Sequence, residues 1–143
     1  MPESENPYCQ CLYYSANALS RLITKMAEEE FATTGLTPSY AFIMMSLNKH
    51  EGLSPGELAN IMMLTPSTIT RLVEKLEVKG LAKRTFKGRN TIIQSTTKGK
   101  ELNDIILKAW NNLFKRYSEV LGENEASRLT SALYASAEKL NKS

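Results

Sequence analysis

The stretch that most constrains the fold of this chain is TPSTITRLVEKLEVKG, residues 65–80. Thr65 suits a helix N-cap, and Pro66 suits the first helical position because its missing N–H has no intrahelical partner anyway. Gly80 suits the left-handed residue that ends a helix. Four apolar residues between these ends follow the i, i+3, i+4, i+7 spacing of one stripe, namely Ile69, Leu72, Val73 and Leu76. The stretch therefore predicts an amphipathic helix with a buried stripe and an exposed opposite face.

The exposed face of this predicted helix combines short hydroxyls with longer charged groups. Its members are Ser67, Thr68, Thr70, Arg71, Glu74 and Lys75. Short hydroxyls can reach base edges or phosphates, and an arginine can bind guanine through two hydrogen bonds. The face therefore has a composition suited to nucleic acid.

A second, shorter helix is predicted just upstream. Residues 54–57 read Ser-Pro-Gly-Glu, which has the S-x-x-E form of a capping box. The apolar positions that follow are Leu58, Ala59, Ile61 and Met62. Only residues 63–64 separate the two helices, and so tight a turn before a helix with a polar exposed side is typical of a helix-turn-helix. An ordinary helical hairpin within a bundle is the alternative.

A basic β-hairpin is predicted directly after the second helix. Residues 81–86 and 91–96 are short runs that contain β-branched residues, and residues 87–90, Lys-Gly-Arg-Asn, have the glycine and asparagine of a hairpin tip. A hairpin in this place is a wing, in which Lys87 and Arg89 could contact phosphates or enter a minor groove.

These segments together resemble the winged helix-turn-helix of the MarR family. The resemblance runs over residues 53–99 and is carried by LSPGELANIMMLTPSTITRLVEKLEVKGLAKR and then GRNTIIQSTTKGKEL. The family's wing usually has an Asp-x-Arg motif followed by Leu-Thr-x-x-Gly. This chain keeps Arg89 and the Thr-Thr-Lys-Gly of residues 96–99 at matching spacing, but it has Lys87 in place of the aspartate and Ser95 in place of the leucine. The implied fold is mainly α, a winged helix-turn-helix with N- and C-terminal dimerisation helices and a small antiparallel hairpin wing.

Positive charge is concentrated in the same region. Residues 65–100 hold nine Lys and Arg against two Glu, a charge of +7 in a chain whose net charge is +3, so the remainder carries −4. Such a segment is an electrostatic footprint for phosphate, although a solvated basic face would have the same composition. The predicted DNA contacts are Ser67, Thr68, Thr70, Arg71, Lys75, Arg84, Lys87, Arg89 and Asn90.

Helices are predicted on both sides of this region. Residues 1–7 are expected to be a disordered lead, and apolar residues then recur at helical spacing over about 8–31. Residues 39–49 predict a further helix, with Tyr40, Phe42, Ile43, Met45 and Leu47 mostly inward and His50 at its end. After the wing, Thr96 or Thr97 should cap one helix that Gly122 ends, and Asn124 should cap the last helix.

The terminal helices carry more apolar surface than is needed to cover a winged helix, which indicates a homodimer. The MarR resemblance implies the same arrangement. The expected organisation is one MarR-like domain over residues 1–143, with the winged helix-turn-helix at about 37–100 and dimerisation helices at about 8–33 and 97–141. A two-fold dimer would place two recognition helices roughly 34 Å apart, so the predicted operator is a pseudopalindrome in double-stranded DNA.

Two cysteines, Cys9 and Cys11, are expected at the start of the first helix. Residues two apart on a helix point to different faces, so no disulfide between them is predicted. Residues 9–13 also resemble the organic hydroperoxide regulators of the family, whose reactive cysteine precedes a Leu-Tyr pair. That resemblance implies a redox sensor at Cys9 with Tyr13 on the same helix face, although the subgroup's second tyrosine would fall at Ile23. Packed or incidental thiols are the alternative.

The sequence offers no support for catalysis. It has no carboxylate pair, glycine-rich phosphate loop, G-x-S-x-G motif or metal-ligand spacing, so neither a cofactor nor a metal is expected. No apolar run approaches the roughly 18 residues of a membrane span, and the N-terminal MPESENPY lacks the apolar core of a secretory signal. A cytoplasmic protein is expected.

The function indicated is sequence-specific DNA binding by a homodimeric transcriptional regulator, a repressor released by a small aromatic or oxidant effector. The effector pocket is expected at Tyr13, Phe42, Met45 and Met62, although these residues could equally belong to the core. The other alternative is a non-catalytic winged helix used for protein contact or for architectural DNA binding.

Overall fold

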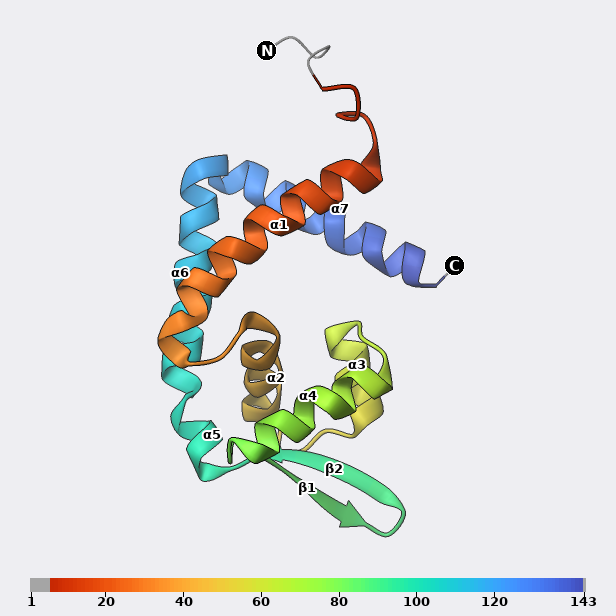
Figure 1. The fold of residues 1–143 in the computed structure, drawn as a ribbon, viewed down its shortest axis with the longest axis vertical. Coiled ribbons are helices and arrows are strands. Elements are labelled where there is room, and N and C mark those ends of the chain that lie inside the picture. Colours follow the sequence, from red (N-terminus) through yellow and green to blue (C-terminus); the bar gives the residue numbers. More distant parts are fainter. Residues whose placement is uncertain (1–5, 143) are drawn as a thin grey trace. The chain divides into compact units, whose positions relative to one another are not determined.

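The computed structural model describes residues 6–142 and divides the chain into two compact units (Figure 1). The terminal unit is Met1–Met26 with Asn111–Ser143, and the central unit is Ala27–Trp110. The divisions fall inside α1 (Leu12–Phe31) and α6 (Asn103–Leu121). Of the disordered lead predicted over residues 1–7, residues 1–5 lie outside the described part of the chain.

The central unit is a winged helix-turn-helix. Its elements are η2 (Ala32–Thr34), α2 (Pro38–Lys49), α3 (Pro55–Met62), α4 (Pro66–Val78), β1 (Ala82–Lys87), β2 (Asn90–Ser95), α5 (Thr97–Glu101) and the first turns of α6. The predicted stripe of α4 is confirmed, because Ile69, Val73 and Leu76 are fully buried and Leu72 is half-buried. The stripe shares the core with side chains such as Ile43 of α2. Burial of this one face fixes which residues of α4 remain exposed.

Local signals set the ends of α3 and α4 as predicted. Ser54 Oγ accepts a hydrogen bond from the Glu57 N–H at 3.1 Å, and the Glu57 carboxylate accepts one from the Ser54 N–H at 2.9 Å, which completes the capping box. The backbone and side-chain hydrogen bonds from Ser54 lower the pKa of Glu57. Thr65 caps α4 by accepting from the Thr68 N–H at 3.3 Å, and Gly80 follows the helix with a φ of 74°.

The wing is a tighter hairpin than predicted. Strand β1 pairs with β2 so that Lys87 lies opposite Asn90, and only Gly88 and Arg89 form the turn. The four-residue tip expected at residues 87–90 is therefore wrong. Gly88 has a φ of 65° at the first turn position, the pattern of a type II′ turn, whose twist matches the strands and needs only two residues. In Figure 1 the hairpin projects away from α4.

Two further predictions about the helices are corrected. The helix expected after the wing is two helices, because Thr96 caps the short α5 and α6 begins separately at Asn103. The last helix, α7 (Glu123–Asn141), begins after Gly122, whose φ is 89°, so Asn124 is already inside it and is not its cap. In α2 the fully buried methionine is Met44, whereas Met45 is half-buried.

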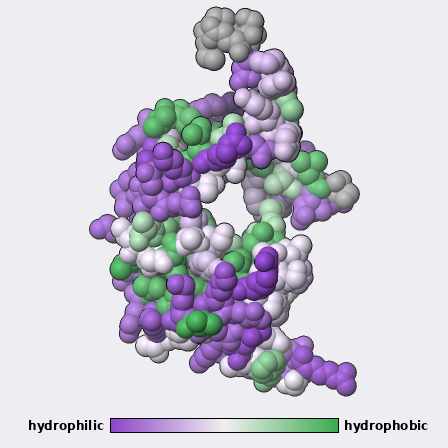
Figure 2. All heavy atoms as spheres, in the orientation of Figure 1, coloured by the Kyte–Doolittle hydropathy of each residue, from purple (hydrophilic) through white to green (hydrophobic). Residues whose placement is uncertain are grey.

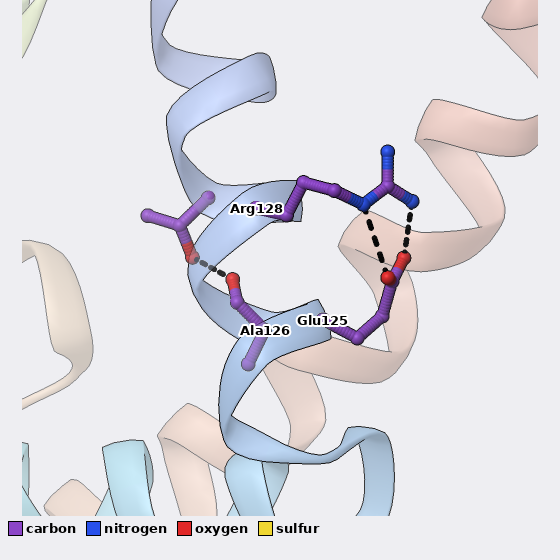
Figure 3. A network of polar contacts seen from close by, with 4 residues as sticks. Glu125, Ala126 and Arg128 are labelled. Carbon is purple, nitrogen blue, oxygen red and sulfur yellow. Dashed lines mark hydrogen bonds and ion pairs between the residues drawn. The ribbon is translucent and has the colours of Figure 1, made fainter.

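The terminal unit contains the start of α1, the later turns of α6 and all of α7. On α7 only Ala126 is buried, and several large apolar side chains of the unit are exposed: Leu12, Leu22, Phe114, Val120, Leu133, Tyr134 and Leu140. Figure 2 shows hydrophobic patches among the surface atoms of these helices. Figure 3 shows an exposed ion pair within α7, in which Arg128 and Glu125 approach to 2.6 Å. Such an exposed pair adds little stability. The exposed apolar side chains give the unit an apolar surface that the single chain does not bury.

Over residues 6–142, no helix has the length and apolar character that crossing a membrane requires.

Candidate nucleic-acid interface

The exposed face of α4 presents two cations that no other part of the described chain neutralises. Arg71 and Lys75 are exposed one helical turn apart, and neither side chain has an ion pair or hydrogen bond within residues 6–142. They line a shallow depression of about 380 Å³ together with Leu72, Glu74 and Val78 of α4 and Tyr40 of α2. Tyr40 and Val78 were not predicted as contacts. A guanidinium and an ammonium placed in this way remain available for an external anion.

The hydroxyls at the start of α4 are partly engaged within the helix. Thr65 Oγ1 lies 2.9 Å from Thr68 Oγ1 and 3.3 Å from Ser67 Oγ. Thr70 Oγ1 donates to the Pro66 carbonyl at 3.0 Å. A hydroxyl has one donor and two acceptor positions, so these contacts leave Thr70 chiefly an acceptor and leave exposed Ser67 the freest of the set.

The predicted DNA contacts on the wing fall into two groups, those at its tip and one at its base. Lys87, Arg89 and Asn90 are exposed at the tip of the hairpin, which Figure 2 shows as hydrophilic. Arg84 lies at the base instead, where its Nε is 2.9 Å from Glu77 Oε1 of α4. The Arg84 side chain keeps 34% of its surface exposed. The tip residues are free to contact an external partner, whereas Arg84 already ties the wing to α4.

The junction between α4 and the wing contains Lys98, a cation whose structural role the sequence did not reveal. Lys98 Nζ donates to the Lys79 carbonyl at 3.1 Å, at the C-terminal end of α4, where a positive charge is favourable. Thr96 Oγ1 donates to the Gly80 carbonyl at 2.6 Å. The Thr-Thr-Lys-Gly segment thus fixes the end of α4 in addition to starting α5. No local periodicity signals this role, because the partners lie 16 to 19 residues apart.

The predicted effector pocket is brought together only in part. Phe42 and Met45 line a cavity of about 580 Å³ in the central unit with Trp110, Leu107 and Ile61. The Phe42 and Trp110 rings meet edge to face, with centroids 6.1 Å apart. The two other predicted residues do not line this cavity. Ile61 lines it in place of its neighbour Met62, and Tyr13 lies in the terminal unit with 80% of its surface exposed.

The cysteines lie in a different conformation from the one predicted. Both thiols are exposed, and both residues precede α1, which begins at Leu12. Residues 7–10 form turns instead, with the Cys11 N–H donating to the Tyr8 carbonyl at 2.9 Å. The argument that Cys9 and Tyr13 share a helix face is therefore wrong. Within residues 6–142, no group of three or more His, Cys, Asp or Glu side chains is placed to hold a metal ion.

A capped helix pair, a recognition helix with free cations and a two-stranded wing define a winged helix-turn-helix protein. A model of the MarR family matches residues 34–89. The HTH-type transcriptional repressor MdtR of Bacillus subtilis (strain 168) is 32% identical over 130 residues, which cover 87% of this chain and 84% of that protein. The chain belongs to the MarR family of transcriptional regulators.

Solved structures share this fold. The repressor CouR of Rhodococcus jostii RHA1, in a structure with a 23-mer DNA duplex, matches with a TM-score of 0.81 and 23% identity, over 90% of this chain and 93% of that chain. AbsC, a MarR family regulator from Streptomyces coelicolor, matches with a TM-score of 0.80 and 21% identity, over 96% and 97% of the two chains.

Proposed function

We propose that this protein is a transcriptional repressor that binds a pseudopalindromic operator as a homodimer and is released by a small-molecule effector. The observation that carries the proposal is the exposed face of α4, where Arg71 and Lys75 have no partner within residues 6–142. The DNA-bound state of CouR, which has the same fold, supports this reading. In this assignment α4 lies in the major groove, and Ser67, Thr68, Thr70 and Arg71 read base edges.

The remaining predicted contacts would position the protein on the duplex. Lys75 at α4 and Lys87, Arg89 and Asn90 at the wing tip would bind phosphates or the adjacent minor groove. Phosphate contacts release counterions, so affinity should fall on the order of 10³ to 10⁵ between about 50 and 200 mM salt if about 6–10 phosphates are neutralised. Homodimerisation is supported by the apolar side chains exposed on the terminal helices.

Fluorescence anisotropy against duplex from the protein's own upstream region and against scrambled duplex tests the proposal. We expect tight, salt-sensitive and selective binding to the first duplex. Arg71→Ala should cost roughly 1–3 kcal/mol on operator and much less on scrambled DNA, because a base contact is lost. Lys108→Ala removes an exposed cation from α6 and is the matched control. Equal and weak binding to both duplexes would instead indicate an architectural or protein-contact role.

The effector is proposed to occupy the cavity lined by Phe42, Met45 and Trp110. Its volume of about 580 Å³ lies within the usual range for small-molecule sites, and its lining is mainly apolar and aromatic. An aromatic compound would release DNA only if it bound the free arrangement of the protein more tightly than the DNA-competent one. Addition of such a compound should therefore lower operator affinity, and occupied operator should lower the affinity for the compound by the same factor.

Oxidant sensing is a second candidate, favoured by the exposure of both thiols. Exposed thiols can be oxidised to sulfenic acid or to a disulfide by a hydroperoxide. Operator binding that peroxide abolishes and reductant restores, in the wild type but not in Cys9→Ser, would assign the signal to Cys9. Peroxide that leaves operator binding intact would exclude this route.

A further inference from the structure

A second cavity lies in the central unit beside the aromatic one. It has a volume of about 410 Å³ and is mainly polar. The end of α2 and the residues after it supply Asn48, Lys49, His50 and Glu51, the base of the wing supplies Lys83, Gln94 and Ser95, and α5 supplies Lys100. The Gln94 side chain donates to the Glu51 carbonyl at 3.0 Å and so holds the segment after α2 against the wing.

The lining of this cavity is strongly positive. Three of its lining residues, Lys49, Lys83 and Lys100, carry ammonium groups, and one, Glu51, carries a carboxylate. Within residues 6–142, none of the three ammonium groups forms an ion pair or hydrogen bond. Lys83 is held opposite Gln94 by the strand register, and Lys100 by the short helix that Thr96 caps. Three unpaired cations at one concavity favour an anion with more than one negative charge.

The polar cavity and the aromatic cavity share part of their walls. Asn48, Lys49 and His50 line both of them. The Asn48 amide nitrogen donates to the Gly99 carbonyl at 3.2 Å and to Asn103 Oδ1 at 3.4 Å, whereas its own Oδ1 is buried without a hydrogen-bond partner. The C-terminal end of α2 therefore borders both cavities.

We propose that the two cavities form one composite site for a ligand in which an aromatic group is joined to a phosphate. The aromatic group lies against Phe42 and Trp110, and the phosphate lies among Lys49, Lys83 and Lys100. The regulatory role of this site rests on the proposed function, because the site assigns an anionic tail to the effector proposed for the aromatic cavity. The ligand site itself does not depend on that function. Binding itself can be measured without DNA.

Trp110 makes this test direct, because it is the only tryptophan of the chain and lines the aromatic cavity. The probes are 4-phenylbutyl phosphate, the uncharged 4-phenylbutan-1-ol and inorganic phosphate, each titrated into the full-length protein while Trp110 fluorescence is followed. We expect the phosphate ester to bind about tenfold or more tightly than the alcohol, because the ammonium groups add charge-assisted hydrogen bonds. Inorganic phosphate should compete only weakly, since it leaves the aromatic cavity empty.

Lysine variants locate the phosphate. Lys83→Gln and Lys100→Gln should each lower the affinity for the phosphate ester roughly threefold to tenfold and leave the alcohol's affinity unchanged, because each removes one exposed cation from the polar cavity. Lys108→Gln removes the same charge outside both linings and should change neither affinity. All three positions are exposed, so the melting temperature should remain that of the wild type.

Equal affinities for the ester and the alcohol would overturn the composite site. It would also be overturned if Lys83→Gln and Lys100→Gln weakened DNA binding but not ester binding, since the lysines would then be backbone contacts to DNA. Equal and weak binding of the wild-type protein to operator and scrambled duplex, with the ester preference intact, would instead count against the proposed repressor and leave the ligand site standing.

Discussion

The two arginines of the wing have different surroundings and should therefore have different roles. Arg89 is exposed in the turn, and Arg84 is paired with Glu77 of α4 at 2.9 Å. We expect Arg89→Ala to lower operator affinity and to reduce the slope of log affinity against log salt by about 1, as the loss of one phosphate contact does. Arg84→Ala should lower affinity with little change of slope. Anisotropy titrations at four salt concentrations give both slopes.

Glu77→Gln provides the control for this distinction. If Arg84 acts by tying the wing to α4, removing its partner should weaken operator binding in the same way as Arg84→Ala. If Arg84 binds phosphate, Glu77→Gln should strengthen binding instead, because it frees the guanidinium and removes a negative charge near DNA. An unchanged salt slope in Arg89→Ala would remove the wing tip from the interface.

Gly99 is required by a close approach of three elements. A Cβ at this position would lie within 3.0 Å of the Leu81 carbonyl oxygen, Ser95 Oγ and Met44 Cε. Gly99→Ala should destabilise the protein by roughly 1–3 kcal/mol, because the backbone of Leu81 and the buried Met44 cannot both move away. Gly56→Ala is the matched control, since its Cβ would meet only Ser54 Oγ at 4.0 Å and alanine favours a helix. Urea unfolding measures both.

At the scale of elements, the capping box of α3 makes part of the stability depend on pH. The hydrogen bonds from Ser54 lower the pKa of Glu57 below its ordinary value of 4.5. A lowered pKa means that the carboxylate stabilises the fold fully above pH 4.5 and that this contribution is lost as the pH falls through the folded-state pKa. Glu57→Gln should therefore lose more stability relative to wild type at pH 7 than at pH 3.

Urea unfolding at the two pH values tests this expectation. Glu28→Gln removes an exposed carboxylate of α1 that caps no helix, so it controls for the loss of one surface charge. If the difference in unfolding free energy between Glu57→Gln and wild type stayed constant between pH 7 and pH 3, the ionised carboxylate would add nothing to the cap.

The elements that could be predicted from sequence are those that local chemistry specifies. Ser54 with Glu57, Thr65 with Pro66, and Gly80 fix the ends of α3 and α4 within a few residues, so these helix ends were predicted correctly. Elements set by distant contacts were not. The break between α5 and α6 falls at Leu102, close to Gly99, which packs tightly against Leu81 and Met44. No periodicity in residues 97–121 contains that packing constraint.

The same reason explains why only two of the four residues predicted for the effector pocket line one cavity. Phe42 and Met45 were identifiable as half-buried positions of one helix, but their neighbours Ile61 and Trp110 come from two other elements. Met62 and Ile61 differ by one residue, and only the packing of α3 decides which of them lines the cavity. Arg84 was predicted as a DNA contact from its charge, which can be read from the sequence, whereas its ion pair with Glu77 cannot.

At the scale of the whole molecule, the terminal unit leaves large apolar side chains exposed in the single chain. A groove of about 410 Å³ within this unit is lined by side chains from three helices, and the large apolar ones include Leu19, Ile23, Leu121, Leu129, Leu133 and Tyr134. Leu133 is 42% exposed and Tyr134 57% exposed in the single chain. A second copy that buried this groove would remove the apolar area from water, at roughly 25 cal/mol per Å². We therefore expect a dimer of about 32 kDa, twice the 16.0 kDa of the chain.

Charge placed in the groove tests this expectation. Leu133→Arg should shift the mass measured by light scattering toward that of one chain, because burying an unpaired guanidinium is costly. Ala135→Arg is the matched control, since two residues along a helix turn about 200° and place the same charge on the opposite face of α7. A dimeric repressor also requires Leu133→Arg to lose operator affinity, because two recognition helices would no longer bind as one unit. A Leu133→Arg protein that remained dimeric with full operator affinity would place the subunit interface elsewhere on the terminal helices.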